Sequence, residues 1–86
     1  MIVDNIELIN RALHSSTIVN LYLSGCDLAE ITVPESLPTS LKELDLSRAK
    51  NIPTELINRA LGSSTIEILD LTFCDLYIVL KHLYNA

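Results

Sequence analysis

The chain contains nearly the same sequence twice. Residues 7–28 read ELINRALHSSTIVNLYLSGCDL and residues 55–76 read ELINRALGSSTIEILDLTFCDL, so 16 of 22 aligned positions are identical at an offset of 48 residues. Chance does not produce such agreement, and one structural unit must therefore occur more than once. A fixed period of this order is typical of stacked repeats, in which each unit buries its apolar face against its neighbours.

A third unit lies between the two copies. Residues 18–28, 41–52 and 66–76 fit the pattern L-x-x-L-x-L-x-x-[N/C]-x-L, with Ile or Leu at the apolar ends. The middle unit has one extra residue before its last apolar position and Ala49 at the ninth position. The anchor leucines, 23 and 25 residues apart, are Leu21, Leu44 and Leu69.

The L-x-L core of each unit alternates apolar and polar residues, which indicates a strand with one buried face. The strands should pair in parallel, because each returns through a crossover of more than a dozen residues. We expect them near residues 19–23, 42–46 and 67–71.

This pattern and spacing resemble those of leucine-rich-repeat proteins, and the resemblance covers nearly the whole chain. LPTSL ahead of ELDLS is similar to the repeats of bacterial effector proteins, although the usual Asn at the ninth position is replaced by Cys26, Ala49 and Cys74. The resemblance implies an α/β fold, a right-handed solenoid with a three-stranded parallel sheet and helices on its convex side. It also implies a single domain over 1–86, with repeats at roughly 4–28, 29–52 and 53–76 and a C-terminal helix over 75–84.

Two crossovers have helical patterns, over residues 4–13 and 53–61. Asp4 is the expected cap of the first helix, and Pro53 is expected in the first turn of the second. His14 and Gly62 stand at equivalent positions, and we expect both to end their helices at positive φ. The inward-facing residues of the second helix should be Leu56, Ile57, Ala60 and Leu61.

The middle crossover differs from the other two. Pro34 and Pro38 exclude a long helix there. An extended middle crossover between two helical ones explains why the strong similarity recurs at 48 residues rather than near 24.

Composition excludes several classes of function. The net charge of −5 argues against nucleic acid and against anionic membrane surfaces as partners. No apolar stretch approaches the ~20 residues that span a bilayer, and the N-terminus lacks the basic and apolar regions of a signal peptide. The expected location is the cytoplasm by default, with secretion by a signal-less route as the alternative for a bacterial effector.

Little in the sequence indicates catalysis, a metal or a cofactor. Cys26 and Cys74 should lie two strands apart, roughly 10 Å, which is too far for a disulfide, and we expect both to be buried thiols. Their spacing is not that of a zinc site. His14 is best explained as a helix terminator. We therefore expect no enzyme activity, no metal and no cofactor.

Stacking the repeats places the polar positions of the strands in rows on the concave face. Aromatic and arginine side chains are enriched at binding hot spots, and here they lie beside an acidic floor that favours a basic partner. The predicted protein-binding residues are Tyr22, Glu43, Asp45, Arg48, Asp70 and Phe73. The expected function is a non-enzymatic protein–protein interaction module. The alternative is a structural, self-assembling repeat unit that forms a homo-oligomer, or a fragment of a longer repeat protein.

Overall fold

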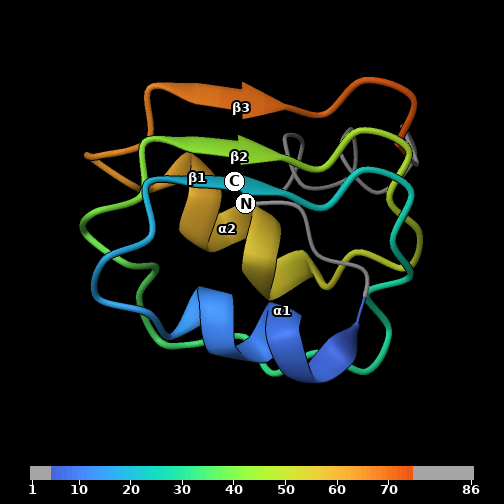
Figure 1. Ribbon diagram of the computed structural model, residues 1–86. Helices are drawn as coiled ribbons and strands as arrows, with labels where there is room; N and C mark the ends of the chain where they lie inside the picture. Colours follow the sequence, from blue (N-terminus) through green and yellow to red (C-terminus); the bar gives the residue numbers. More distant parts are fainter. Residues whose placement is uncertain (1–4, 75–86) are drawn as a thin grey trace.

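The computed structural model describes residues 5–74, which form two helices and a three-stranded sheet (Figure 1). In chain order the elements are α1 (Ile6–Leu13), β1 (Asn20–Tyr22), β2 (Glu43–Asp45), α2 (Thr54–Leu61) and β3 (Ile68–Asp70). The predicted strands and the first two predicted helices are confirmed. The helix expected over 75–84 lies outside the described residues. We call the described parts of the three repeats the first unit (5–28), the second unit (29–52) and the third unit (53–74).

The sheet has the order β1-β2-β3, and both pairs of strands are parallel. Leu21, Leu44 and Leu69 are direct partners across it. An α/β fold with a three-stranded parallel sheet is therefore confirmed, and its register agrees with the alignment of the repeats.

The sheet is flat rather than concave (Figure 1). Strands in a sheet are about 4.8 Å apart, whereas packed helices are about 8–10 Å apart, so a helix behind every strand would bend the sheet. Here the crossover over residues 29–42 contains no helix. The extended segment occupies less width than a helix, and this leaves the two helical crossovers room behind a flat sheet.

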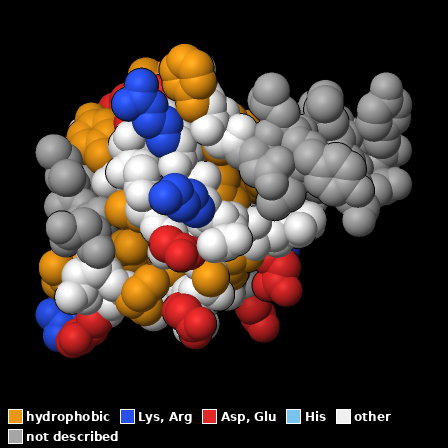
Figure 2. All heavy atoms as spheres, turned by 90° about the vertical axis from the view of Figure 1, so that its right-hand side faces the viewer, with side chains coloured by type: hydrophobic (Ala, Val, Ile, Leu, Met, Phe, Trp, Pro, Cys, Tyr) orange, Lys and Arg blue, Asp and Glu red, His pale blue; other side chains and the backbone are white. Residues whose placement is uncertain are grey.

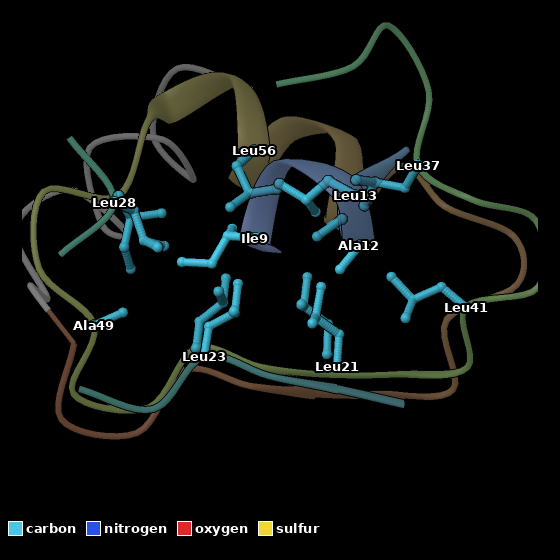
Figure 3. Close-up of a cluster of buried hydrophobic side chains, with 14 of the residues drawn as sticks. Ile9, Ala12, Leu13, Leu21, Leu23, Leu28, Leu37, Leu41, Ala49 and Leu56 are labelled. Carbon is cyan, nitrogen blue, oxygen red and sulfur yellow. The ribbon is translucent and has the colours of Figure 1, made fainter. Parts of the chain in front are cut away.

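The core lies between the sheet and the helices, and every unit contributes to it (Figure 3). Leucines at the inward positions of β1 and β2 and just beyond them are fully buried, and each such side chain stabilises the fold by roughly 1.5–3 kcal/mol. Ile9 and Ala12 of α1 pack against them from the opposite side. Within residues 5–74 the fully buried leucines are Leu13, Leu21, Leu23, Leu28, Leu41, Leu44, Leu46 and Leu56.

The predicted helix termini need three corrections. Asn5, not Asp4, caps α1, because its side chain accepts hydrogen bonds from the backbone N–H groups of Glu7 and Leu8. Pro53 is the residue before α2 rather than a member of its first turn. The prediction that both helices end at a residue with positive φ was wrong, since φ is −110° at His14 and −87° at Gly62.

Both helices instead end with a tighter, 3₁₀-type turn. The N–H of His14 bonds to the carbonyl oxygen three residues earlier, and the N–H of Ser63 does the same. Such bonds satisfy the last carbonyl groups of a helix without a left-handed residue.

Two of the hydrogen bonds between the first and second units involve Thr32 and Ser40 of the middle crossover. The backbone N–H of Thr32 donates to Asn10 Oδ1 over 2.8 Å, and Ser40 Oγ donates to the carbonyl oxygen of Ile18 over 2.6 Å. Asn10 therefore lies on the side of α1 that faces the second unit.

Candidate binding surface on the sheet

The structure brings the predicted site residues together on neighbouring strands. Tyr22, Asp45 and Asp70 are direct partners in one row of the sheet. Glu43 belongs to the adjacent row, between Asn20 and Ile68. We call the outward-facing residues of these two rows, including Asn20 and Ile68, the sheet surface.

Tyr22 and Glu43 are joined across β1 and β2. The Tyr22 hydroxyl donates to Glu43 Oε1 over 2.8 Å, and both side chains are half-buried. This hydrogen bond to a carboxylate raises the pKa of Tyr22 above its usual value of 10.0, and the charge of Glu43 acts in the same direction. The ring is thus fixed against the sheet with its hydroxyl occupied.

The two aspartates have a structural role that the sequence analysis missed. Asp45 Oδ1 accepts from the backbone N–H of Ser47 over 2.8 Å, and Asp70 Oδ1 accepts from that of Thr72 over 2.9 Å. The Thr72 hydroxyl also donates to Asp70 and is the main reason that the pKa of this carboxyl lies below 3.8. These bonds turn the chain at the ends of β2 and β3. The carboxylates of Asp45 and Asp70 are therefore held in place by hydrogen bonds to the backbone.

Beyond the strands lies a row with left-handed backbone, which we call the strand-end row: Gly25, Arg48 and Phe73. Their φ values are 74°, 59° and 57°. A left-handed conformation is normal for glycine but costs roughly 1–2 kcal/mol for other residues. Arg48 and Phe73 nevertheless occupy it, and the Arg48 guanidinium carbon lies 5.3 Å from the centre of the Phe73 ring. The two side chains therefore form a cation–π contact.

The strand-end row belongs to the face at which the strands leave the sheet. On this face hydrophobic side chains lie beside both basic and acidic ones (Figure 2). Phe73 is 78% exposed and Ile68 on the sheet surface is 55% exposed. Ile68 was not among the predicted site residues, although its alignment with Glu43 already placed it on this surface.

The same face contains a polar link between the first two units. Asp27 Oδ1 accepts from Asn51 Nδ2 and from the backbone N–H of Ala29, each over 3.0 Å. The side-chain amide of Asn51, followed by that backbone N–H, lowers the pKa of Asp27 below 3.8. Sequence alone did not indicate this pair, because Asn51 is the extra residue of the middle repeat and has no counterpart in the other two.

Both cysteines are thiols in the structure. Cys74 is buried as expected, and its sulfur lies 2.7 Å from the carbonyl oxygen of Leu71. Cys26 is only half-buried, with its sulfur 3.9 Å from the carbonyl oxygen of Ser24, so the expectation of a buried thiol was wrong there. Cys26 packs against the leucine core from its border, and its sulfur faces the carbonyl oxygen of its own loop.

Within residues 5–74, no group of three or more histidine, cysteine or acidic side chains is arranged to hold a metal ion. No helix in that same range has the length and apolarity that crossing a membrane requires. No family model matches the chain, and neither a curated protein nor a solved structure shows significant similarity to it.

Proposed function

We propose that this chain is a short leucine-rich-repeat solenoid that acts as a non-enzymatic protein-interaction module. The proposal rests on the repeated units, on the parallel register that aligns them, and on the surface they build. Its binding site comprises the sheet surface together with the strand-end row. The site is accessible to a protein partner in the cytoplasm, or after export by a route that needs no signal peptide.

The main support for this proposal is the exposure and the backbone conformation of Phe73. Its ring is 78% exposed, and its backbone is left-handed. The first unit has Gly25 at the same position and in the same conformation. Folding alone therefore favours glycine at position 73, whereas an exposed aromatic ring held by Arg48 favours contact with another molecule.

The charge of the site indicates a basic partner. Glu43, Asp45 and Asp70 supply three carboxylates on the sheet surface, and Arg48 lies beside Phe73 at its end. Fixed carboxylates attract a basic partner and speed its association more than they tighten the complex. The aromatic side chains Tyr22 and Phe73 would supply most of the affinity.

The experiment uses a displayed library of random peptides to select ligands for the wild-type protein. Anisotropy titrations then compare the wild type with Phe73→Gly and Leu61→Ala. Leu61 is a matched control because it is also an exposed apolar residue, 46% exposed, but lies on α2 rather than on the sheet. We expect Phe73→Gly to weaken binding by about 10- to 100-fold, as hot-spot residues do, and Leu61→Ala to have no effect.

Selected peptides should be enriched in lysine and arginine. Equal affinity of the wild type and Phe73→Gly for every selected ligand would overturn the proposed site. Circular dichroism of each variant separates lost binding from lost folding.

A self-assembling unit is the second candidate. Val19 and Ile68, next to β1 and on β3, are 47% and 55% exposed on the two outer strands of the sheet. Outer strands offer backbone groups to which another chain can pair. Light scattering over a range of protein concentrations tests this candidate, because a self-assembling unit gains mass as concentration rises.

A further inference from the structure

The internal repeat provides a direct comparison between covered and uncovered surfaces. The first and third units contain the same heptapeptide ELINRAL, in α1 and α2. The second unit lies between them, so it covers opposite sides of these two helices. Any difference in burial at equivalent positions therefore reports what the second unit covers.

The side that α2 turns toward the second unit is indicated by the burial of its residues, together with a pocket shared with the second unit at the C-terminal end of the helix. Arg59 and Ser63 of α2 and its following loop line this pocket together with residues of the second unit, including Glu35 and Leu37. Leu56 is on the same side of the helix as Arg59 and Ser63, at a spacing of three and seven residues. Leu56 is fully buried, and Arg59 is half-buried.

On α1 the equivalent side is uncovered. It carries Leu8 and Arg11, and it points away from the second unit because Asn10, on the opposite side, binds Thr32. Ser15, in the loop that follows, borders both this side and the second unit. Leu8 is 39% exposed, whereas its counterpart Leu56 is fully buried. Arg11 extends into solvent and pairs with Glu7 over 2.9 Å, whereas Arg59 is enclosed beside the second unit.

A pocket of about 450 Å³ marks this uncovered side. Its lining includes Arg11, Ser15 and Thr17, the counterparts of three residues that in the third unit line the pocket shared with the second unit. We call Leu8, Arg11, Ser15, Thr17 and Val19 the N-terminal end face. The carbonyl group of Tyr22 also points to this side of β1, since its counterparts at Asp45 and Asp70 accept hydrogen bonds from the preceding strand.

We propose that the N-terminal end face binds an extended, proline-containing polypeptide segment that carries an acidic residue followed by a leucine. The segment Glu35–Leu41 has this chemistry and already occupies the matching surface of the third unit. There Glu35 shares a pocket with Arg59, and Leu37 is buried at 8% exposure. A bound segment would place its acid near Arg11 and would cover Leu8, as the corresponding position Leu56 is covered in the third unit. This site adjoins the sheet surface at Asn20 but lies on the outer edge of β1 and on α1, away from Phe73, and it does not depend on the proposed function.

The test uses a synthetic peptide with the sequence of residues 29–50, added to the isotopically labelled wild-type protein and followed by NMR. We expect shifts at Arg11, Thr17 and Val19. Leu8→Lys should weaken binding about tenfold or more, because a contact side chain is replaced by a charge. Leu61→Lys is the matched control, since Leu61 is exposed to a similar degree but lies on α2, on the side away from the second unit. A peptide with Leu37→Asp should not bind.

Absence of shifts at millimolar peptide would overturn the proposal, as would equal weakening by Leu8→Lys and Leu61→Lys. Concentration-dependent self-association that Leu8→Lys abolishes would assign the end face to a second copy and also refute the peptide ligand. Phe73→Gly should bind this peptide like the wild type, so failure here and failure of the sheet site are distinguishable. Urea unfolding of each variant verifies that the fold is retained.

Discussion

Gly25 and Phe73 occupy equivalent positions of the repeat and share a left-handed backbone, with φ of 74° and 57°. The two side chains differ completely, whereas the backbone conformation is the same. The conformation is therefore imposed by the hydrogen bonds of the strand ends rather than chosen by the residue. Arg48, between them in the strand-end row, has the same conformation at φ 59°.

Phe73→Gly should raise the free energy of unfolding by up to about 1 kcal/mol, because glycine removes the left-handed strain and loses only an exposed ring. Gly25→Ala should lower it by about 1 kcal/mol. No heavy atom lies within 4 Å of a Cβ added at Gly25, so any loss there arises from the backbone. Urea unfolding measures both. An unchanged stability for Gly25→Ala would contradict the explanation.

Leu8 and Leu56 provide a second matched pair. Leu56→Ala should cost about 2–5 kcal/mol of stability, since it empties a fully buried position. Leu8→Ala should cost less than about 1 kcal/mol, because this leucine is 39% exposed. Thermal and urea unfolding of the two variants, measured side by side, give the two losses of stability. Similar losses would mean that the two units are not covered differently.

Asp45→Ala should lower the free energy of unfolding by about 1 kcal/mol, because the backbone N–H of Ser47 loses its acceptor. Asp45→Asn keeps an oxygen in the same place and should restore most of that loss. The comparison separates the hydrogen bond from the charge. If Asp45→Asn is as destabilising as Asp45→Ala, the charge rather than the bond stabilises the turn.

Acid should destabilise the protein through Asp27 and Asp70. Both carboxyls have a folded-state pKa below 3.8, so the stability they contribute is fully present above that value and is lost as pH falls through the lower folded values. The urea concentration at the unfolding midpoint should therefore decrease as the pH is lowered from about 6 to about 2. Asp27→Asn should make the decline shallower, and an unchanged slope would contradict the assignment.

Tyr22 should titrate above pH 10, since its hydroxyl donates to Glu43. Stability from this bond is fully present below pH 10.0 and is lost as pH rises through the higher folded pKa. The absorbance difference between the wild type and Tyr22→Phe isolates this one tyrosine. Glu43→Gln should return the pKa of Tyr22 toward its usual value. An unchanged pKa in this variant would show that another group raises it.

The strands, their parallel order and their register were predictable because the repeat aligns itself. Leucines at the same position of successive units had to become neighbours, and Leu21, Leu44 and Leu69 do. The helices were predictable from their apolar spacing, although the capping residue was displaced by one position, from Asp4 to Asn5.

Other features depend on neighbours that a linear pattern does not reveal. The sequence predicts the same inward face for both helices, yet Leu13 is 1% exposed and Leu61 is 46% exposed. The expectation that Leu61 faces inward was wrong, because only Leu13 has the second unit beside it. The left-handed Arg48 and Phe73 were not predictable either, since these residue types rarely adopt that conformation. The aspartate bonds to the backbone appear only once the strand ends are positioned.

The extended crossover over residues 29–42 also sets a rule for the growth of this architecture. Copying a single unit would place two helices next to each other behind strands only about 4.8 Å apart, and the sheet would have to bend. Copying one helical unit together with one extended unit adds no such mismatch. The smallest duplication that leaves the sheet flat is therefore the 48-residue pair, the offset at which the sequence itself recurs.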